Sequence, residues 1–407
     1  MLNITVRNHL KRLWVGSALV LAACGGASGG PDIEPAPVVV APSTPTPPPT
    51  TQQPTGETDG LTDGLLRDRF ASSFKVGAVL SRNQIDTNDQ NAALALSQFS
   101  SITPSFQLKA DWISPTEGVY NFEDADRVVD WAIANGMEVR GHALVWHEGT
   151  PDYFYEGTRE EIRARLETYI STVVEHFRGR VTSWDVANEV VSVDLWSANP
   201  VGPDRRSRWF EAVGNADYID WAFHAARAAD PNAKLYLNEY STEHPIKGPW
   251  MIEILQRLQD RGVPIDGVGH QFHLSLADDP AELMQAIDNV DNLFMGLDNQ
   301  ITELDVDFYN DPGSCWSAQT GCDADLGAVA PVDMLATQAA LMRGVFEGLS
   351  QRSSVSSVTT WGVTDDESWL NTSPAERFNY PLLFDRQGEP KSAFWAVVDP
   401  DYVIPTE

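Results

Sequence analysis

The chain has 407 residues, of which 42% are hydrophobic, and its 28 lysines and arginines against 58 aspartates and glutamates give a formal net charge of −30. This length accommodates one large catalytic domain or two ordinary ones. The acidic balance argues against nucleic acid as a partner and against attachment to anionic lipid through protein charge.

The first residues have the pattern of an export signal. Arg7, Lys11 and Arg12 precede an apolar run, residues 13–23, that is too short to span a bilayer as a helix. Residues 21–24 read LAAC and resemble a bacterial lipoprotein processing site, which implies cleavage before Cys24 and acylation of its sulfur. An ordinary signal peptide with an incidental cysteine is the alternative.

We therefore expect residues 1–23 to be a lipoprotein signal peptide and the rest to be exported. The residue after the cysteine is Gly25, whereas an aspartate there is associated with inner-membrane retention. The expected location is thus the outer membrane, on its cell-surface or periplasmic face, with the lipid anchor as the membrane partner.

Residues 24–58 read as a disordered Pro/Thr-rich tether. Nine prolines fall between residues 31 and 58, and no lysine or arginine occurs between Cys24 and Arg67. Such a segment is extended and semi-rigid and cannot bury a core. The rest, residues 59–407, shows no second linker, so we expect a single domain there.

Short apolar segments alternate with longer helical ones throughout that domain. The helical segments include residues 124–136, where Val128, Val129, Ala132 and Ile133 are expected to share a face and Gly136 to end the helix. The other helical segments are 159–177, 216–230, 251–262 and 334–349. The expected strands are 74–80, 100–108, 137–146, 181–188, 233–240, 267–274, 299–306 and 355–363.

Strands that alternate with helices indicate a parallel α/β sheet, because parallel strands need a crossover connection. Eight such units predict a closed (β/α)8 TIM barrel, preceded by the signal peptide and the tether. An open, doubly wound sheet is the alternative, but no GxGxxG motif follows the first strand.

Polar and aromatic residues end one expected strand after another. In such a barrel the carboxyl ends of the strands form one mouth, where active sites lie. The residues expected there are His142, Trp146 and His147 after strand three, Asn188 and Glu189 after strand four, Asn238 and Glu239 after strand five, Gln271 and His273 on strand six, Glu303 and Asp305 on strand seven, and Trp361 and Trp369 on and after strand eight.

Glu189 and Glu303 are two carboxylates on separate strands that face the same mouth. Glycosidic bond cleavage needs such a pair, one protonated to assist the leaving oxygen and one ionised to attack or to activate water. Taken singly, a glutamate at a strand end is more often a helix cap or a surface charge, and Glu239 has an equally suitable position. The thirteen tryptophans would supply flat apolar faces for sugar rings.

Five segments, in chain order, resemble the signature segments of glycoside hydrolase family 10: GHALVWH, WDVANE, GVGHQFHL, ITELDV and TTWGVTDDESWL. The similarity runs from about Phe74 to Trp395. Members of that family are mostly retaining endo-β-1,4-xylanases on a (β/α)8 barrel, so the resemblance implies a xylan-type polysaccharide as substrate and no cofactor.

The resemblance also implies roles for individual residues. Glu189 matches the acid/base catalyst and Glu303 the nucleophile, and retention requires their carboxyl groups to be about 5–5.5 Å apart. Asn188 matches the amide that binds the sugar 2-hydroxyl, His273 the histidine that contacts the nucleophile, and Asp305 its outer partner. Sugar-binding positions are matched by Lys109, His142, Trp146, Gln271, Trp361 and Trp369, whereas Glu239 falls in a structural segment.

One departure from the family concerns the segment after the second strand. The family usually has a Glu-Asn pair that holds the sugar two places from the cut, where this chain has Ser105 and Phe106. Losing these partners would cost roughly 1–3 kcal/mol for each group left unpaired. Phe106 offers either a stacking face or a block, and a second departure, Glu148-Gly149, replaces a common Ser-Gln pair.

Cys315 and Cys322 are the cysteines other than Cys24, and in an exported protein we expect a disulfide between them rather than free thiols. No metal site is expected from the motifs present.

Three functions remain open. The first is an endo-xylanase. The second is the same retaining chemistry on a decorated xylan, on short oligosaccharides or on another β-linked glycan, and the third is a glycan-binding lipoprotein without activity. We expect a monomer.

Overall fold

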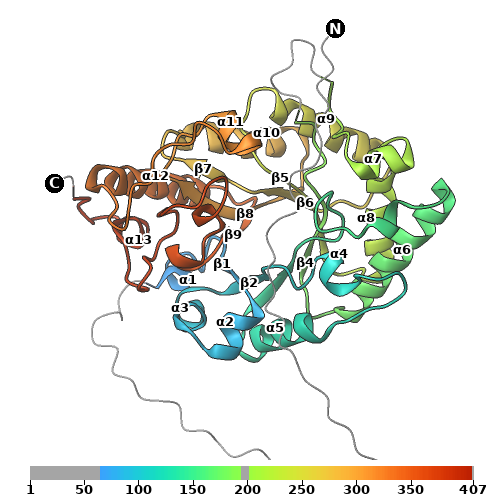
Figure 1. Cartoon of the computed structure of the whole chain (residues 1–407), viewed down its shortest axis with the longest axis horizontal. Coiled ribbons are helices and arrows are strands. Elements are labelled where there is room, and N and C mark those ends of the chain that lie inside the picture. Colours follow the sequence, from blue (N-terminus) through green and yellow to red (C-terminus); the bar gives the residue numbers. More distant parts are fainter. Residues whose placement is uncertain (1–64, 194–200, 406–407) are drawn as a thin grey trace, which may run out of the picture. The chain divides into compact units, whose positions relative to one another are not determined.

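The computed structural model describes residues 65–193 and 201–405. The expected signal peptide, Cys24 and the tether lie outside these residues. All eight expected strand regions are present (Figure 1), as β1 Lys75–Leu80, β2 Ser101–Pro104, β3 Glu138–Gly141, β4 Ser183–Asn188, β5 Lys234–Glu239, β6 Gly267–His270 with β7 His273–Ser275, β8 Asp298–Asp307 and β9 Val355–Thr360.

The strands form a closed parallel barrel. β1 to β6 pair in sequence, β6 pairs with β8, β8 with β9, and β9 returns to β1. The sixth position is shared by two segments, because β6 pairs with the first half of β8 and β7 with the second half. The predicted (β/α)8 barrel is therefore confirmed, and an open sheet is excluded.

Helices surround this barrel (Figure 1). The longer ones are α3 Gln90–Gln98, α5 Glu123–Ala134, α6 Arg159–His176, α8 Asp217–Ala229, α9 Lys247–Asp260, α10 Pro280–Leu293 and α12 Val332–Ser350. The shorter ones are α1 Leu66–Arg69, α2 Arg82–Thr87, α4 Ala110–Ile113, α7 Arg208–Val213, α11 Gly313–Ala318, α13 Ser392–Val398 and the 3-10 turns Asp152–Tyr155, Asp365–Glu367 and Trp369–Asn371. No helix within the described ranges is long and apolar enough to cross a membrane.

Helix α5 shows how the apolar pattern becomes packing. Val128, Val129 and Ala132 are fully buried against the barrel, as their spacing predicts. Ile133 is 44% exposed, so its expected place on the buried face is wrong. Each helical residue advances by about 100°, and Ile133 therefore lies beyond the edge of the face centred on Val129 and Ala132.

Strands β2 and β3 end earlier than expected. β2 ends at Pro104, and residues 105–108 form a turn; β3 ends at Gly141, although Leu144 and Val145 still donate backbone hydrogen bonds to the carbonyls of β4. Leu108 and residues 142–145 are buried there without continuing a regular ladder. Apolar runs alone do not distinguish such a case from a strand.

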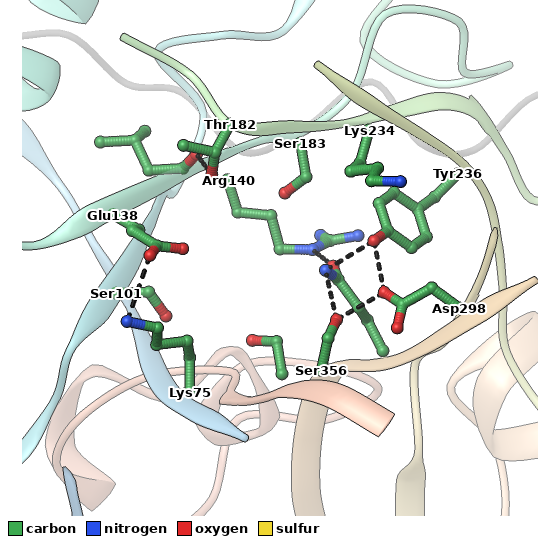
Figure 2. A pocket seen from close by; sticks show the side chains of 13 residues that line it. Lys75, Ser101, Glu138, Arg140, Thr182, Ser183, Lys234, Tyr236, Asp298 and Ser356 are labelled. Carbon is green, nitrogen blue, oxygen red and sulfur yellow. Dashed lines mark hydrogen bonds and ion pairs between the residues drawn. The ribbon is translucent and has the colours of Figure 1, made fainter. Parts of the chain in front are cut away.

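A polar cavity of about 360 Å³ lies at the end of the barrel where the strands begin (Figure 2). Its lining comes from the first residues of the strands, among them Lys75, Glu138 and Asp298. The charges there are paired: Lys75 Nζ lies 3.2 Å from Glu138 Oε1, and Tyr236 donates to Asp298 at 2.5 Å. This cavity is separate from the mouth at the carboxyl ends.

Candidate active site

Glu303 is a deeply enclosed carboxylate of the mouth, with 4% of its surface exposed. It lies in the middle of β8. Asn238 Nδ2 donates to its Oε1 at 2.7 Å, and His273 Nε2 lies 3.3 Å from its Oε2. Both carboxylate oxygens are thus held, which fixes the direction in which the group points.

His273 connects Glu303 to a second carboxylate. Its Nδ1 lies 2.8 Å from Asp305 Oδ1, and Asp305 also accepts a hydrogen bond from the indole nitrogen of Trp369 at 2.8 Å. Burial lowers the pKa of His273, but Asp305 and Glu303 raise it more strongly, to about 10. The imidazole is therefore a cation at neutral pH.

The pKa of Glu303 lies below its usual value. Burial raises this pKa, but the nearby His142 and the hydrogen-bonded, cationic His273 together lower it more. His142 Nδ1 lies 3.9 Å from Glu303 Oε1 and 2.9 Å from Asp185 Oδ2. Asp185 in turn is held by Arg140, whose Nη1 donates to it at 2.7 Å. Glu303 is accordingly ionised in the resting protein.

A chain of amides links the two carboxylates. Asn188 Oδ1 accepts from Asn238 Nδ2 at 2.9 Å and from Gln271 Nε2 at 3.2 Å. Gln271 Nε2 also lies 3.4 Å from Glu189 Oε1. Because Asn238 donates to Glu303 as well, the network runs from Glu189 to Glu303 across the mouth, and both glutamates face the same space.

Glu189 has looser surroundings than Glu303. Its side chain is 16% exposed, and the Arg205 guanidinium and the His147 imidazole approach its Oε2 to 3.9 and 4.0 Å. Its backbone has φ +56°, in the left-handed region that non-glycine residues rarely adopt. A hydrogen bond from its N–H to the Asn238 carbonyl at 2.9 Å fixes this conformation.

Glu239 is a structural residue. Its side chain is fully buried, and Lys247 Nζ, also fully buried, lies 2.7 Å from Oε1. Its Oε2 accepts the backbone N–H of Val191 at 2.9 Å, which ties down the loop after Glu189. Both carboxylate oxygens are therefore occupied away from the mouth, although its position in sequence equals that of Glu189.

Aromatic side chains and one lysine line the space around the two glutamates. Trp361 packs edge-on against His142 with ring centroids 5.2 Å apart, and Trp369 packs against His273 at the same distance. Lys109 Nζ lies 4.7 Å from the ring centroid of Trp146. Burial lowers the pKa of Lys109, and Glu303 is the main group that opposes the shift.

Ser105 and Phe106 follow β2 at the rim. Both are half-buried, and the Phe106 ring packs edge-on against Trp112 with centroids 4.5 Å apart. Trp112 is fixed by donating to Asp124 at 3.1 Å. An aromatic pair thus occupies the position at which the family has two hydrogen-bonding side chains.

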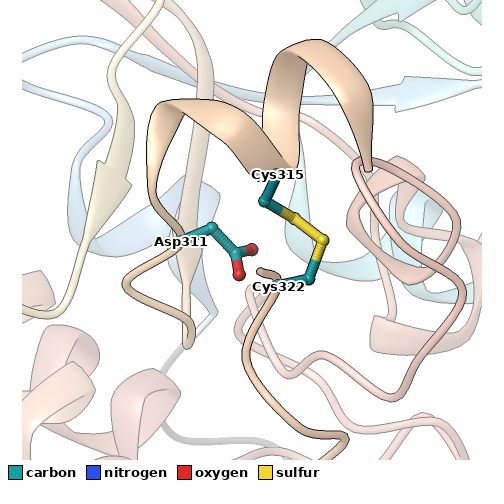
Figure 3. Close-up of side chains that lie close together, drawn as sticks. All are labelled: Asp311, Cys315 and Cys322. Atoms are coloured by element: carbon teal, nitrogen blue, oxygen red, sulfur yellow. A yellow bond between two sulfur atoms is a disulfide. The ribbon is translucent and has the colours of Figure 1, made fainter. Parts of the chain in front are cut away.

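One cluster within residues 65–193 and 201–405 brings together enough donor groups for a metal ion, namely Asp311, Cys315 and Cys322, whose donor atoms lie within 4.8 Å of one another (Figure 3). However, a disulfide joins Cys315 to Cys322, and Asp311 forms an ion pair with Arg377. These ligands are already engaged, so the cluster is a structural tie.

Three positions that contact the residues discussed above were not identified from the sequence: Asp185, Arg140 and Arg205. Asn238 was expected at the mouth, because it precedes a glutamate at a strand end as Asn188 does, but its contact with Glu303 was not expected. Arg205 lies in a loop without periodicity and has no comparable signal.

Comparisons with known proteins agree with this arrangement. The model for glycosyl hydrolase family 10 matches residues 65–400. The chain is 39% identical to a β-1,4-xylanase of Dictyoglomus thermophilum, over 84% of this chain and 92% of the relative. It is 38% identical to a thermostable celloxylanase of Thermoclostridium stercorarium, over 82% and 87%.

Solved structures show the same fold. The crystal structure of xylanase B from Clostridium stercorarium F9 has a TM-score of 0.75 and 38% identity, and the match covers 83% of this chain and 100% of that one. A variant enzyme in complex with xylotriose has a TM-score of 0.75 and 32% identity, with 82% and 99% covered.

The His273 cation predicts a pH effect. In His273→Gln the charge is lost while a side-chain amide remains, so the pKa of Glu303 should rise. Activity that requires ionised Glu303 is lost as the pH falls through this pKa, so the acid limb of kcat/KM should move to higher pH. The measurement is a pH profile on a chromogenic β-glycoside.

The matched control is His176→Gln. His176 is a half-buried histidine at the end of α6, and its Nε2 lies 2.8 Å from Asp126 Oδ1. The acid limb of this variant should coincide with that of the unmodified protein. An unchanged acid limb in His273→Gln would show that His273 does not set the ionisation of Glu303.

Proposed function

The chain belongs to glycosyl hydrolase family 10, and on this premise we propose that it hydrolyses internal β-1,4-xylosidic bonds of xylan with retention of anomeric configuration. The observation that carries the proposal is the contrast between two carboxylates at one mouth. Glu303 is buried, held at both oxygens and ionised, whereas Glu189 is looser and partly exposed. Different surroundings are what assign the two roles in glycosidases.

In the first step Glu303 attacks the anomeric carbon while Glu189 donates its proton to the glycosidic oxygen. The bond to the leaving sugar breaks, and an ester forms between Glu303 and the remaining chain. In the second step Glu189, now a carboxylate, takes a proton from water, which attacks the same carbon and releases Glu303. Two inversions give net retention.

The amide network orients this chemistry. Asn188 Oδ1 already accepts two hydrogen bonds, from Asn238 and Gln271, which leaves Nδ2 as its donor group. That nitrogen donates one N–H to Glu189 Oε1 at 3.4 Å, and its second N–H is left for a sugar in the mouth. It can therefore bind the 2-hydroxyl, an interaction that strengthens in the transition state.

The remaining side chains suit a sugar polymer. Trp361 and Trp369 offer apolar ring faces beside Glu303, and Lys109 above Trp146 offers a donor near both carboxylates. Solved structures of relatives include complexes with xylotriose and xylotetraose. All these groups come from one chain, so a monomer suffices for the reaction.

Residues 65–405 incubated with plain xylan should release a ladder of xylo-oligosaccharides, resolved by length. The control, Glu303→Gln, should lower turnover by at least about a thousandfold, because the amide cannot form the ester intermediate. Tight xylan binding without any product would favour a glycan-binding protein instead, and cleavage by Glu303→Gln at near the original rate would refute the mechanism.

A second substrate class is favoured by one observation. The half-buried Phe106, packed on Trp112, replaces the polar ligands of the sugar two places from the cut. A pair of hydrogen-bonding groups there requires a free sugar hydroxyl. An aromatic edge makes no such demand and therefore tolerates a sugar whose hydroxyl carries a substituent. The same retaining chemistry would then act preferentially on decorated xylan, on short oligosaccharides or on another β-linked glycan.

The double variant Ser105→Glu/Phe106→Asn tests this preference. If these residues determine specificity, the variant should gain activity on plain xylan by about thirtyfold relative to glucuronoxylan and arabinoxylan, as two restored hydrogen bonds of about 1 kcal/mol each would give. The ratio of kcat/KM values is the readout. An unchanged ratio would remove the second class.

We also propose that the chain is exported and anchored to the outer membrane by lipid on Cys24. The support is the basic stretch, the apolar run and the LAAC sequence at residues 21–24. In bacterial cells fed radiolabelled palmitate, the full chain should be labelled and Cys24→Ala should not. Equal labelling of both, or labelling of neither, would exclude acylation at this residue.

A further inference from the structure

Trp316 is a large aromatic side chain that is 46% exposed in the loop after β8. It lies on the short helix α11, and β8 is the strand that carries Glu303, so this loop leaves the barrel at the same end as the site. Single exposed apolar side chains are common and carry no meaning by themselves. The surroundings of Trp316 therefore decide whether it has a role.

Trp316 continues a row of rings that starts at the nucleophile. Glu303 contacts His273, the His273 ring lies 5.2 Å from that of Trp369, and Trp369 lies 5.9 Å from Trp316 at an interplanar angle of 47°. The indole nitrogen of Trp369 is fixed on Asp305. The exposed ring is thus the outer end of a continuous aromatic surface, one ring beyond the residues next to Glu303.

The loop that carries Trp316 is held in place covalently. Cys315, the residue before it, is bonded to Cys322, which closes the segment around α11 (Figure 3). The disulfide restricts the conformations that this loop can adopt. A ring that must meet a ligand gains from it, because less conformational freedom is lost when the ligand binds.

Two further ties hold the same loop against the rest of the barrel mouth. Asp311 pairs with Arg377, and both side chains are almost fully buried, with 0% and 2% exposed. Gln319 Nε2 donates to the Pro374 carbonyl at 3.0 Å. Because residues 374 and 377 follow Trp369 in the chain, these contacts bind the loop of Trp316 to the segment that carries its aromatic neighbour.

We propose that Trp316 is an additional sugar-binding residue, at which a unit of the β-1,4-linked chain distant from the cleaved bond stacks on the indole face. The proposal rests on the proposed function. A polysaccharide cut internally extends out of the site on both sides, and pyranose rings present apolar C–H faces that suit an indole. Long substrates reach Trp316, whereas short ones do not.

The test is the dependence of kcat/KM on substrate length. Trp316→Ala should lose about tenfold on xylohexaose, equivalent to about 1.4 kcal/mol, and less than twofold on xylotriose. Trp316→Phe should restore much of the loss, because it retains an aromatic face. The matched control is Met295→Ala, since Met295 is 94% exposed between α10 and β8, at the opposite end of the barrel, and should leave both values unchanged.

The double variant Cys315→Ser/Cys322→Ser tests whether the disulfide holds Trp316 in place for binding. Like Trp316→Ala, it should lose activity on xylohexaose. An equal loss on both substrates in Trp316→Ala, or no loss, would overturn the proposal. If the unmodified protein cleaves neither substrate, the proposed function fails. Calorimetric binding of xylohexaose to Glu303→Gln with and without Trp316→Ala then decides the role of Trp316, and equal affinities would overturn it.

Discussion

A buried carboxylate stays ionised only if neighbouring groups replace the solvation it loses, and the mouth of this barrel is organised around that requirement at Glu303. His273 supplies a positive charge, and Asp305 keeps it positive by raising the pKa of the imidazole to about 10. On the other side, His142 approaches Glu303 and is itself held by Asp185. The nucleophilic role that we propose for Glu303 depends on this balance of charges.

Two irregularities in the barrel place the groups that act on Glu303. The sixth position is divided at Gln271 and Phe272, where Phe272 has φ +54°, and β7 then pairs His273 directly with Asp305. Glu189 follows the last residue of β4 with φ +56°, which turns its side chain toward the amide network. At these two positions an unfavourable backbone conformation gives a side chain the direction it needs, while the surrounding ladder and core keep it in place.

The strands and most of the mouth could be predicted from the sequence. Both the alternation of short apolar segments with helical ones and the polar residues at strand ends are local properties of the sequence. Strand ends at residues 104 and 141 could not, since the apolar residues that follow are buried in irregular segments that line the site. Asn188-Glu189 and Asn238-Glu239 are the same local pattern. In the structure the approach of Lys247 to Glu239 sets them apart, and that contact depends on how α9 packs, which no local pattern reveals.

The most direct measurement is to trap the covalent intermediate. A 2-deoxy-2-fluoro xylobioside with a good leaving group should inactivate the protein. The fluorine slows both steps, whereas the good leaving group speeds only the first, so the ester on the protein accumulates. Mass spectrometry of the digested protein should then find one fluoroxylobiosyl group on the peptide that contains Glu303. Labelling of Glu189 instead, or turnover without any adduct and with inverted product, would contradict the assignment of Glu303 as an ionised nucleophile.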